Sequence, residues 1–170
     1  MNILKLLFGL RHILVKLLEW SAIIIMATLV FVVLWGVFTR YCLGNQDERT
    51  DELATTLIMW ASMLGASVAY AEKGHLGVDY FVGKLDPAAQ RINEIAVHLI
   101  VALFAAVVLI YGGYLLASRT FAAEQMLQAL KIKAGYKYIV IPFSGCFMVL
   151  FAFEHILELL TGKKNGEAAQ

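Results

Sequence analysis

The chain has 170 residues, of which 61% are hydrophobic and only 16% are charged, and its mean hydropathy is +0.74. Soluble domains usually contain about 45–50% apolar and about 25% charged residues, so this composition excludes a water-soluble globule and indicates a membrane protein. The formal net charge is +1, which excludes the strongly basic field that nucleic-acid binding requires.

The first twenty residues combine apolar faces with one narrow polar stripe. Its members recur at spacings of three and four residues: Asn2, Lys5, Gly9, His12, Lys16 and Glu19. This pattern predicts a helix that lies in the membrane surface over residues 1–19, with residues 4–19 as its amphipathic part. A cleavable signal peptide is disfavoured because the apolar character continues beyond residue 20. A first span that begins early, near Ile13, is the alternative.

Four apolar segments are long enough to cross a membrane. They cover residues 20–38, 53–71, 95–116 and 138–160. A spanning helix takes about 20 residues, and the fourth segment reaches this length because Glu154 and His155 can lie near the headgroups. No segment has the alternation of a strand. The expected fold is therefore one all-α integral membrane domain over residues 1–170, with four transmembrane helices in a bundle and surface-lying amphipathic helices beside them.

The connections add two further predictions. Residues 75–84 mix apolar and charged side chains and suit a second surface-lying segment. Asp86 and Pro87 predict the start of a helix that continues through Leu116, about 45 Å long and so longer than the membrane core. Residues 118–137 are expected to form a long connection of mixed polarity before the fourth span.

Four spans place both termini on the same side of the membrane. Lysine and arginine number eight on that side and six on the other, which favours cytoplasmic termini under the positive-inside rule. Cys42 would then lie near the outer surface and Cys146 about 12 Å deeper, too far apart for a disulfide. Both cysteines are expected to be free thiols.

The spans hold almost no ionisable side chains. Apart from Glu154 and Glu158 near one end, no Asp, Glu, Lys or Arg falls within them. Ion-coupled carriers keep such groups near the midplane, and many build their site from paired broken helices, which this chain lacks. Motifs for hydrolytic, phosphate-binding or zinc chemistry are absent too. The sequence therefore predicts neither a transport site within this subunit nor an enzyme.

Small residues form a stripe on the second span, where Ala61, Gly65 and Ala69 recur every four residues. Such a stripe lets another helix come close. It fits packing within the four-helix bundle, and it fits equally well docking to a partner membrane protein.

The histidines raise the question of a cofactor. His98 and His155 are expected at matched depth on two helices, where they would be able to ligate a haem or, with Glu154 and Glu158, a metal. Bulky residues surround His155, whereas a haem needs small neighbours. Interfacial histidines with ordinary hydrogen bonds are the favoured interpretation, and neither a cofactor nor a metal is expected. A haem-bearing anchor subunit of a respiratory complex stays open as an alternative.

Two stretches carry a family resemblance. The first runs Asp51-Glu52-Leu53-Ala54, then Trp60, Gly65-Ala66, Glu72-Lys73 and His75-Leu76-Gly77-Val78-Asp79, and the second is Ile141-Pro142-Phe143-Ser144-Gly145. Together with four spans and a length near 170 residues, they resemble the small membrane subunit of tripartite ATP-independent periplasmic (TRAP) transporters.

The resemblance implies a division of labour in the inner membrane of a bacterium. In that family a periplasmic binding protein captures an organic acid, often a dicarboxylate or a sialic acid, and a large membrane subunit carries the substrate and sodium sites. The small subunit acts as a membrane scaffold for the large one. Residues 40–52 and 118–137 are expected to face the binding protein. A stand-alone multispan carrier is the main alternative. The candidates for a partner interface are Asp51, Glu52, Trp60, Ala61, Gly65, Ala69, His75 and Asp79.

Overall fold

The computed structural model describes residues 2–44, 48–72 and 87–161, and nearly all of them are helical. Four of the helices are long and apolar enough to cross a membrane, which confirms the predicted all-α membrane fold. Residues 75–84, with the candidates His75 and Asp79, lie outside the described ranges. The elements are α1 (Asn2–Cys42), α2 (Glu48–Ala71), α4 (Pro87–Phe104), the π-helix η1 (Ala105–Gly112), α5 (Gly113–Ala122), β1 (Met126–Leu127), β2 (Ile132–Lys133), α6 (Gly135–Tyr138) and α7 (Val140–Thr161).

The first helix differs from the sequence prediction because it has no boundary near residues 19 and 20. α1 runs for 41 residues, or about 62 Å, which is about twice the thickness of the hydrocarbon core. No glycine or proline occurs near the expected boundary, and the Ser21 hydroxyl donates to the Leu17 carbonyl (2.8 Å) instead of capping a new helix. The depth of residues 2–19 relative to the membrane surface stays a prediction.

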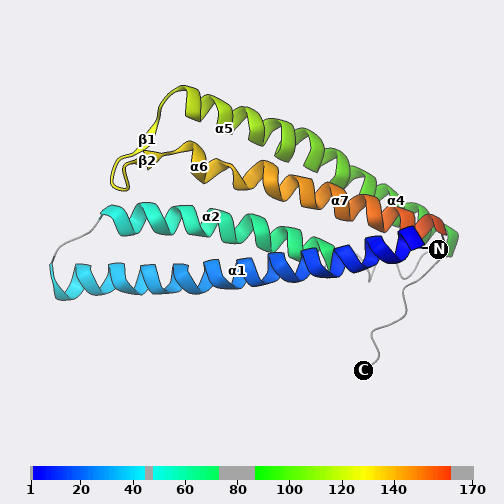
Figure 1. Ribbon diagram of the computed structural model, residues 1–170, viewed down its shortest axis with the longest axis horizontal. Coiled ribbons are helices and arrows are strands. Elements are labelled where there is room, and N and C mark those ends of the chain that lie inside the picture. Colours follow the sequence, from blue (N-terminus) through cyan, green and yellow to red (C-terminus); the bar gives the residue numbers. More distant parts are fainter. Residues whose placement is uncertain (1, 45–47, 73–86, 162–170) are drawn as a thin grey trace.

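The spanning helices lie side by side in a row and do not close into the expected bundle (Figure 1). α1 packs on α2, α2 packs on α7, and α7 packs on the long third helix formed by α4, η1 and α5. In the most apolar stretch of each span, the buried share of residues ranges only from 6% to 33%. A row one helix thick therefore leaves broad faces for lipid or for a partner.

The contact between α7 and the third helix depends on two glycines. A Cβ atom at Gly145 would lie 2.7 Å from the Leu109 Cβ, and one at Gly113 would lie 2.8 Å from the Ile141 Cγ2. Neither position has room for a side chain, so the two helices approach as closely as their backbones allow. The second of the stretches that carry the family resemblance, which ends at Gly145, thus forms an internal helix contact.

A short β-hairpin interrupts the helical fold, where no strand was expected. Met126 pairs with Lys133 and Leu127 with Ile132, and the Ala134 amide donates to the Gln125 carbonyl (2.8 Å). The hairpin joins α5 to α6, so only part of the connection expected over residues 118–137 is irregular. Its turn lies beside the first residues of α2 (Figure 1).

Candidate functional site

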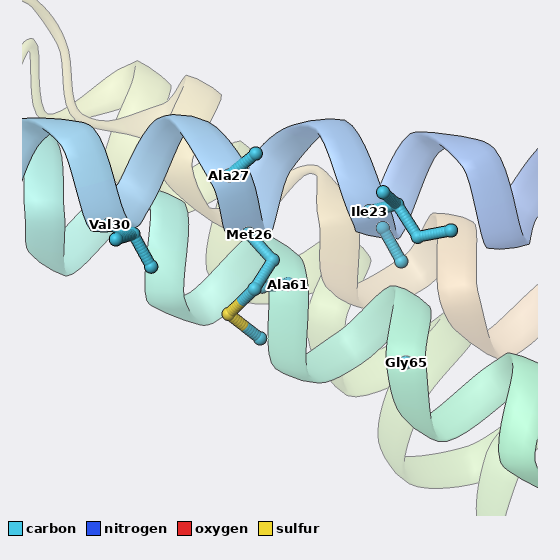
Figure 2. A pocket seen from close by; sticks show the side chains of 7 residues that line it. Ile23, Met26, Ala27, Val30, Ala61 and Gly65 are labelled. Atoms are coloured by element: carbon cyan, nitrogen blue, oxygen red, sulfur yellow. The ribbon is translucent and has the colours of Figure 1, made fainter.

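An apolar groove runs along the outer surface between α1 and α2. Its volume is about 480 Å³, and Figure 2 shows its lining from close by. The lining residues are all apolar: Ala22, Ile23, Met26, Ala27, Val30, Ala61 and Gly65. Five of these residues belong to α1, and two members of the small-residue stripe, the buried Ala61 and the partly exposed Gly65, complete the lining from α2.

Gly65 differs from the glycines on α7 and α5 in what surrounds it. A Cβ added at Gly65 would meet no atom within 4 Å, whereas one at Gly113 or Gly145 would collide with a neighbouring helix. A small residue in a membrane helix usually marks a place where another helix comes close. Among the described residues, no helix comes close to the Cα of Gly65 on this side.

The outward face of α2 is also unlike a surface made for lipid. It exposes Thr55, Ser62, Ala66 and Ala69, and Ile58 is the one large exposed hydrophobic residue on this helix. The exposed faces of α1 and of the third helix consist instead mostly of large apolar side chains. Ser62 Oγ donates to the Ile58 carbonyl (2.7 Å), and Thr55 Oγ1 donates to the Glu52 carbonyl (2.9 Å), both within α2. Both hydroxyls are thus satisfied locally, so a close apolar partner would leave neither without a hydrogen bond.

Glu52 ties the start of α2 to the tip of the β-hairpin. Its Oε2 atom accepts hydrogen bonds from the backbone amides of Ala129 and Leu130, both at 3.0 Å. A further link on the same side joins the Lys137 ammonium to the Thr55 hydroxyl (3.4 Å). The neighbouring candidate, Asp51, is exposed. Glu52 is therefore a positioning residue for the hairpin.

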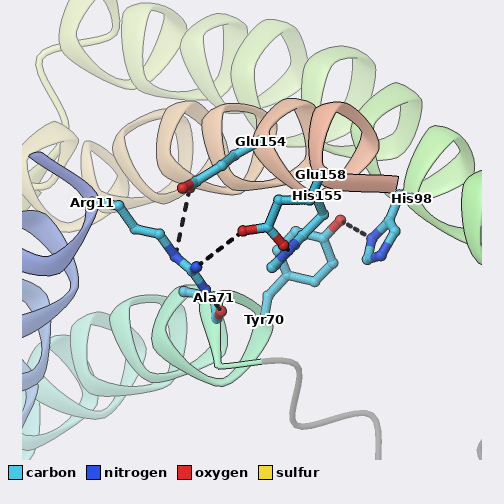
Figure 3. A network of polar contacts seen from close by, with 7 residues as sticks. All are labelled: Arg11, Tyr70, Ala71, His98, Glu154, His155 and Glu158. Atoms are coloured by element: carbon cyan, nitrogen blue, oxygen red, sulfur yellow. Dashed lines mark hydrogen bonds and ion pairs between the residues drawn. The ribbon is translucent and has the colours of Figure 1, made fainter. Parts of the chain in front are cut away.

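A cluster of charged groups joins three helices at the opposite end of the molecule (Figure 3). Arg11 of α1 donates from Nη2 to the Ala71 carbonyl at the end of α2 (2.7 Å). Its Nε lies 3.5 Å from Glu154 Oε2, and its Nη1 lies 3.6 Å from Glu158 Oε1, both on α7. One guanidinium thus balances two carboxylates that are largely buried.

Two histidines and a tyrosine extend this cluster to the third helix. A hydrogen bond joins the Tyr70 hydroxyl to His98 Nδ1 (2.9 Å), and His155 Nδ1 lies 3.8 Å from Glu158 Oε2. The rings of His98 and His155 are stacked, with centroids 4.9 Å apart. Axial haem ligands must point at the iron from opposite faces of the macrocycle, so stacked rings do not fit ligation by both histidines.

A metal site at this cluster would need more ligands than the described residues offer. Across residues 2–44, 48–72 and 87–161, no group of three or more His, Cys, Asp or Glu side chains is arranged to hold a metal ion. The cluster instead acts as a polar tie between helix ends. It was not foreseen as a unit, although Glu154 and Glu158, one helical turn apart in an apolar span, were a signal that a cation must lie nearby.

The remaining candidates are divided between core and surface. Trp60 is half-buried and packs against the hydrophobic core, and its indole nitrogen is buried with no hydrogen-bond partner among the described residues. Ala69 is exposed on α2. The structure therefore brings Ala61 and Gly65 together in the groove, and it separates both of them from Glu52 at the hairpin.

Four spanning helices in an open row, with charged groups at their ends and an unfilled apolar groove, define a multi-pass membrane subunit. Residues 29–162 match the family described as Tripartite ATP-independent periplasmic transporters, DctQ component. The chain therefore belongs to the family of small permease subunits of TRAP transporters. Members of this family are components of a transporter.

Two relatives agree with this assignment. The chain is 29% identical over 153 residues to the sialic acid TRAP transporter small permease protein SiaQ of Vibrio cholerae, and the match covers 89% of this chain and 86% of SiaQ. It is 34% identical over 84 residues to a TRAP transporter small permease protein of Haemophilus influenzae, covering 49% of this chain and 52% of the relative.

Proposed function

We propose that this chain is the scaffold subunit of a sodium-coupled TRAP transporter that takes up an organic acid of the C4-dicarboxylate or sialic acid class. It works in the inner membrane of a bacterium, with both termini in the cytoplasm, beside a large membrane subunit and a periplasmic binding protein. The similarity to SiaQ of Vibrio cholerae, which is named for sialic acid, supports the sialic acid class. The substrate and sodium sites belong to the large subunit.

The open space beside Gly65 carries the docking part of this proposal. The groove lies between α1 and α2, within segments that are long and apolar enough to span a membrane. The residues around it on α2 are small, and the Ser62 hydroxyl among them bonds within the helix. In a membrane, helices associate through close packing because lipid is as apolar as their side chains. A transmembrane helix of the large subunit that lies along α2 would fill the groove and cover Gly65 and Ala69, above the buried Ala61.

The row arrangement argues against a stand-alone carrier. A carrier needs a polar site enclosed between helices near the midplane. Here the charged cluster of Arg11, Glu154 and Glu158 lies at one end of the row, and it ties helices together. Liposomes that contain this subunit alone are therefore expected to take up no substrate, whereas liposomes with both membrane subunits and the binding protein are expected to do so.

The variant Gly65→Leu tests the docking surface. A Cβ atom at position 65 would meet no described atom within 4 Å, so the groove has room for a larger side chain, and leucine favours a helix over glycine by up to about 1 kcal/mol. We expect the isolated subunit to stay folded while the amount of large subunit that purifies with it falls about tenfold or more, equivalent to about 1.4 kcal/mol.

A matched control is Ala106→Leu, which adds a comparable side chain at an exposed position of η1. This variant is expected to assemble normally, because a large apolar residue suits a surface that faces lipid. Normal assembly of Gly65→Leu, or equal loss in both variants, would contradict docking at the groove.

A further inference from the structure

We infer that the β-hairpin of residues 125–134 is a docking surface for the soluble binding protein of the transporter, and that Glu52 positions it. This inference rests on the proposed function, because it needs a soluble partner on the hairpin side of the membrane. It adds a specific surface and a role for one of the residues that carry the family resemblance.

The hairpin has a defined shape that is anchored at its tip. Glu52 projects from α2, a long helix, and its carboxylate accepts two successive backbone amides at the turn. Hydrogen bonds to an ionised acceptor are stronger than those between neutral groups. The Lys131 amide also donates to the Leu127 carbonyl (2.8 Å) across the turn. The tip is thus fixed to the helix row as well as to its own strands.

Two residues of this region adopt an uncommon backbone conformation. Glu124, just before the hairpin, has a φ of 49°, and Lys131, in the turn, has a φ of 54°. The left-handed region is unfavourable for a residue other than glycine, and such a conformation persists where surrounding contacts enforce it. A linker that only connected two helices would need neither this conformation nor the bonds from Glu52.

The exposed chemistry of the hairpin suits an acidic and partly apolar protein surface. Residues 125–134 contain two lysines and no acidic residue. Met126 is 59% exposed and is paired with the exposed Lys133, while Ile132 on the other face is 44% exposed. Cations beside apolar side chains give a partner both electrostatic steering and area to bury.

A soluble protein fits this surface better than the headgroups of lipids do. Attraction to anionic lipid needs basic residues near the membrane but no fixed backbone shape. The hairpin instead presents a single shape, held from α2 through Glu52. The partner that this surface would recognise is therefore the water-soluble component of the same transporter.

Binding of that component to the whole membrane complex tests the inference. The two membrane subunits are placed together in nanodiscs of neutral lipid. The binding protein is purified with the substrate that it already carries, and its affinity for the nanodiscs is measured. We expect the double variant Lys131→Glu with Lys133→Glu to weaken binding at least tenfold and to reduce its salt dependence. The control Lys16→Glu, at the opposite end of the row, is expected to bind normally.

The positioning role of Glu52 has its own readout. Glu52→Gln keeps the size of the side chain but loses the charge that strengthens both hydrogen bonds, and we expect binding to weaken about threefold to tenfold. Added to the double lysine variant, it is expected to cause little further loss, because both changes act on one surface. Additive losses would overturn the positioning role.

Other outcomes separate this inference from the proposed function. Unchanged binding in the double lysine variant overturns docking at the hairpin, even when the two membrane subunits copurify normally. A loss that appears only in nanodiscs with anionic lipid identifies the hairpin as a lipid contact and overturns the inference too. If the two membrane subunits do not copurify even without substitutions, the proposed function fails, and the inference fails with it.

Discussion

At one end of the helix row, charged groups from α1 and α7 are buried against one another, whereas at the other end a single carboxylate holds an exposed hairpin. Arg11 contacts Glu154, Glu158 and the last carbonyl of α2, so it joins elements that lie far apart in the chain. The Glu52 carboxylate accepts hydrogen bonds from two amides of a turn. Both residues form polar contacts between elements, but Arg11 links helices to one another, whereas Glu52 links a helix to a surface turn.

The two ends therefore differ in what their polar contacts hold in place, helices at one end and a surface turn at the other. Removing Arg11 takes a cation away from two largely buried carboxylates, which is expected to weaken the contact between α1 and α7. Removing Glu52 releases a turn that water can solvate, so the helices would persist. Contacts that a fold requires are usually buried, and contacts that shape a recognition loop lie nearer the surface.

The largest expected effect is an all-or-none difference in chemical labelling between the two ends. Cys42 is an exposed free thiol at the hairpin end, and Glu72 is exposed at the Arg11 end. With Cys146 replaced by serine and the termini in the cytoplasm, a membrane-impermeant maleimide is expected to label Cys42 in intact spheroplasts. The variant Glu72→Cys, made with Cys42 also replaced, is expected to be labelled only after lysis. The reverse pattern would place the hairpin in the cytoplasm.

The next largest effect is expected at Arg11. Arg11→Met should lower the free energy of unfolding by about 3 kcal/mol, because it leaves the carboxylates of Glu154 and Glu158 without their shared cation. Thermal unfolding in detergent, followed by tryptophan fluorescence, measures the loss. Arg11→Lys keeps the charge and is expected to recover much of it. Equal stability of Arg11→Met and the unsubstituted chain would mean that this end does not hold the row together.

A smaller effect on stability is expected from Glu52→Gln, about 1 kcal/mol, because the lost bonds belong to a surface turn. Hydrogen exchange should accelerate at the Ala129 and Leu130 amides and stay unchanged in the middle of α2. A fall in stability as large as that of Arg11→Met would remove the contrast between the two ends.

The smallest effect is expected from Tyr70→Phe. This variant removes the hydroxyl that bonds to His98 but keeps the ring, which contacts both histidine rings edge-on, and it should cost about 1 kcal/mol or less. The same thermal measurement checks it, with Tyr114→Phe on the exposed face of α5 as the control. A larger loss would show that the hydrogen bond, and not Arg11, is the main tie at this end.

The spans were predictable from sequence because their apolar character is a local property. The start of the third helix at Pro87 was predictable for the same reason, since proline fixes the first turn by itself. The pairing of Arg11 with Glu154 and Glu158 was not, because nothing local links residues so far apart in the chain. The hairpin was missed because Gln128 and Ala129 are not typical turn formers, and the carboxylate that holds the turn comes from α2.

The stripe on α2 illustrates where sequence reasoning reaches its limit. Gly65 and Gly145 are equally small, and the sequence alone left packing and docking as equal possibilities for the stripe. Which glycine touches a neighbour depends on the order of helices in space. That order is set by contacts along the whole row, and the structure was needed to separate a closed contact from an open groove.

The position of α7 in the row bears on how the subunit is made in the cell. The fourth span, α7, lies between two spans that are synthesised before it, α2 and the third helix. Until α7 leaves the ribosome, the third helix lacks the neighbour that its Gly113 and Leu109 contact. The nascent chain therefore cannot assemble helix by helix in the order of translation. The row reaches its final arrangement only once the C-terminal span has inserted.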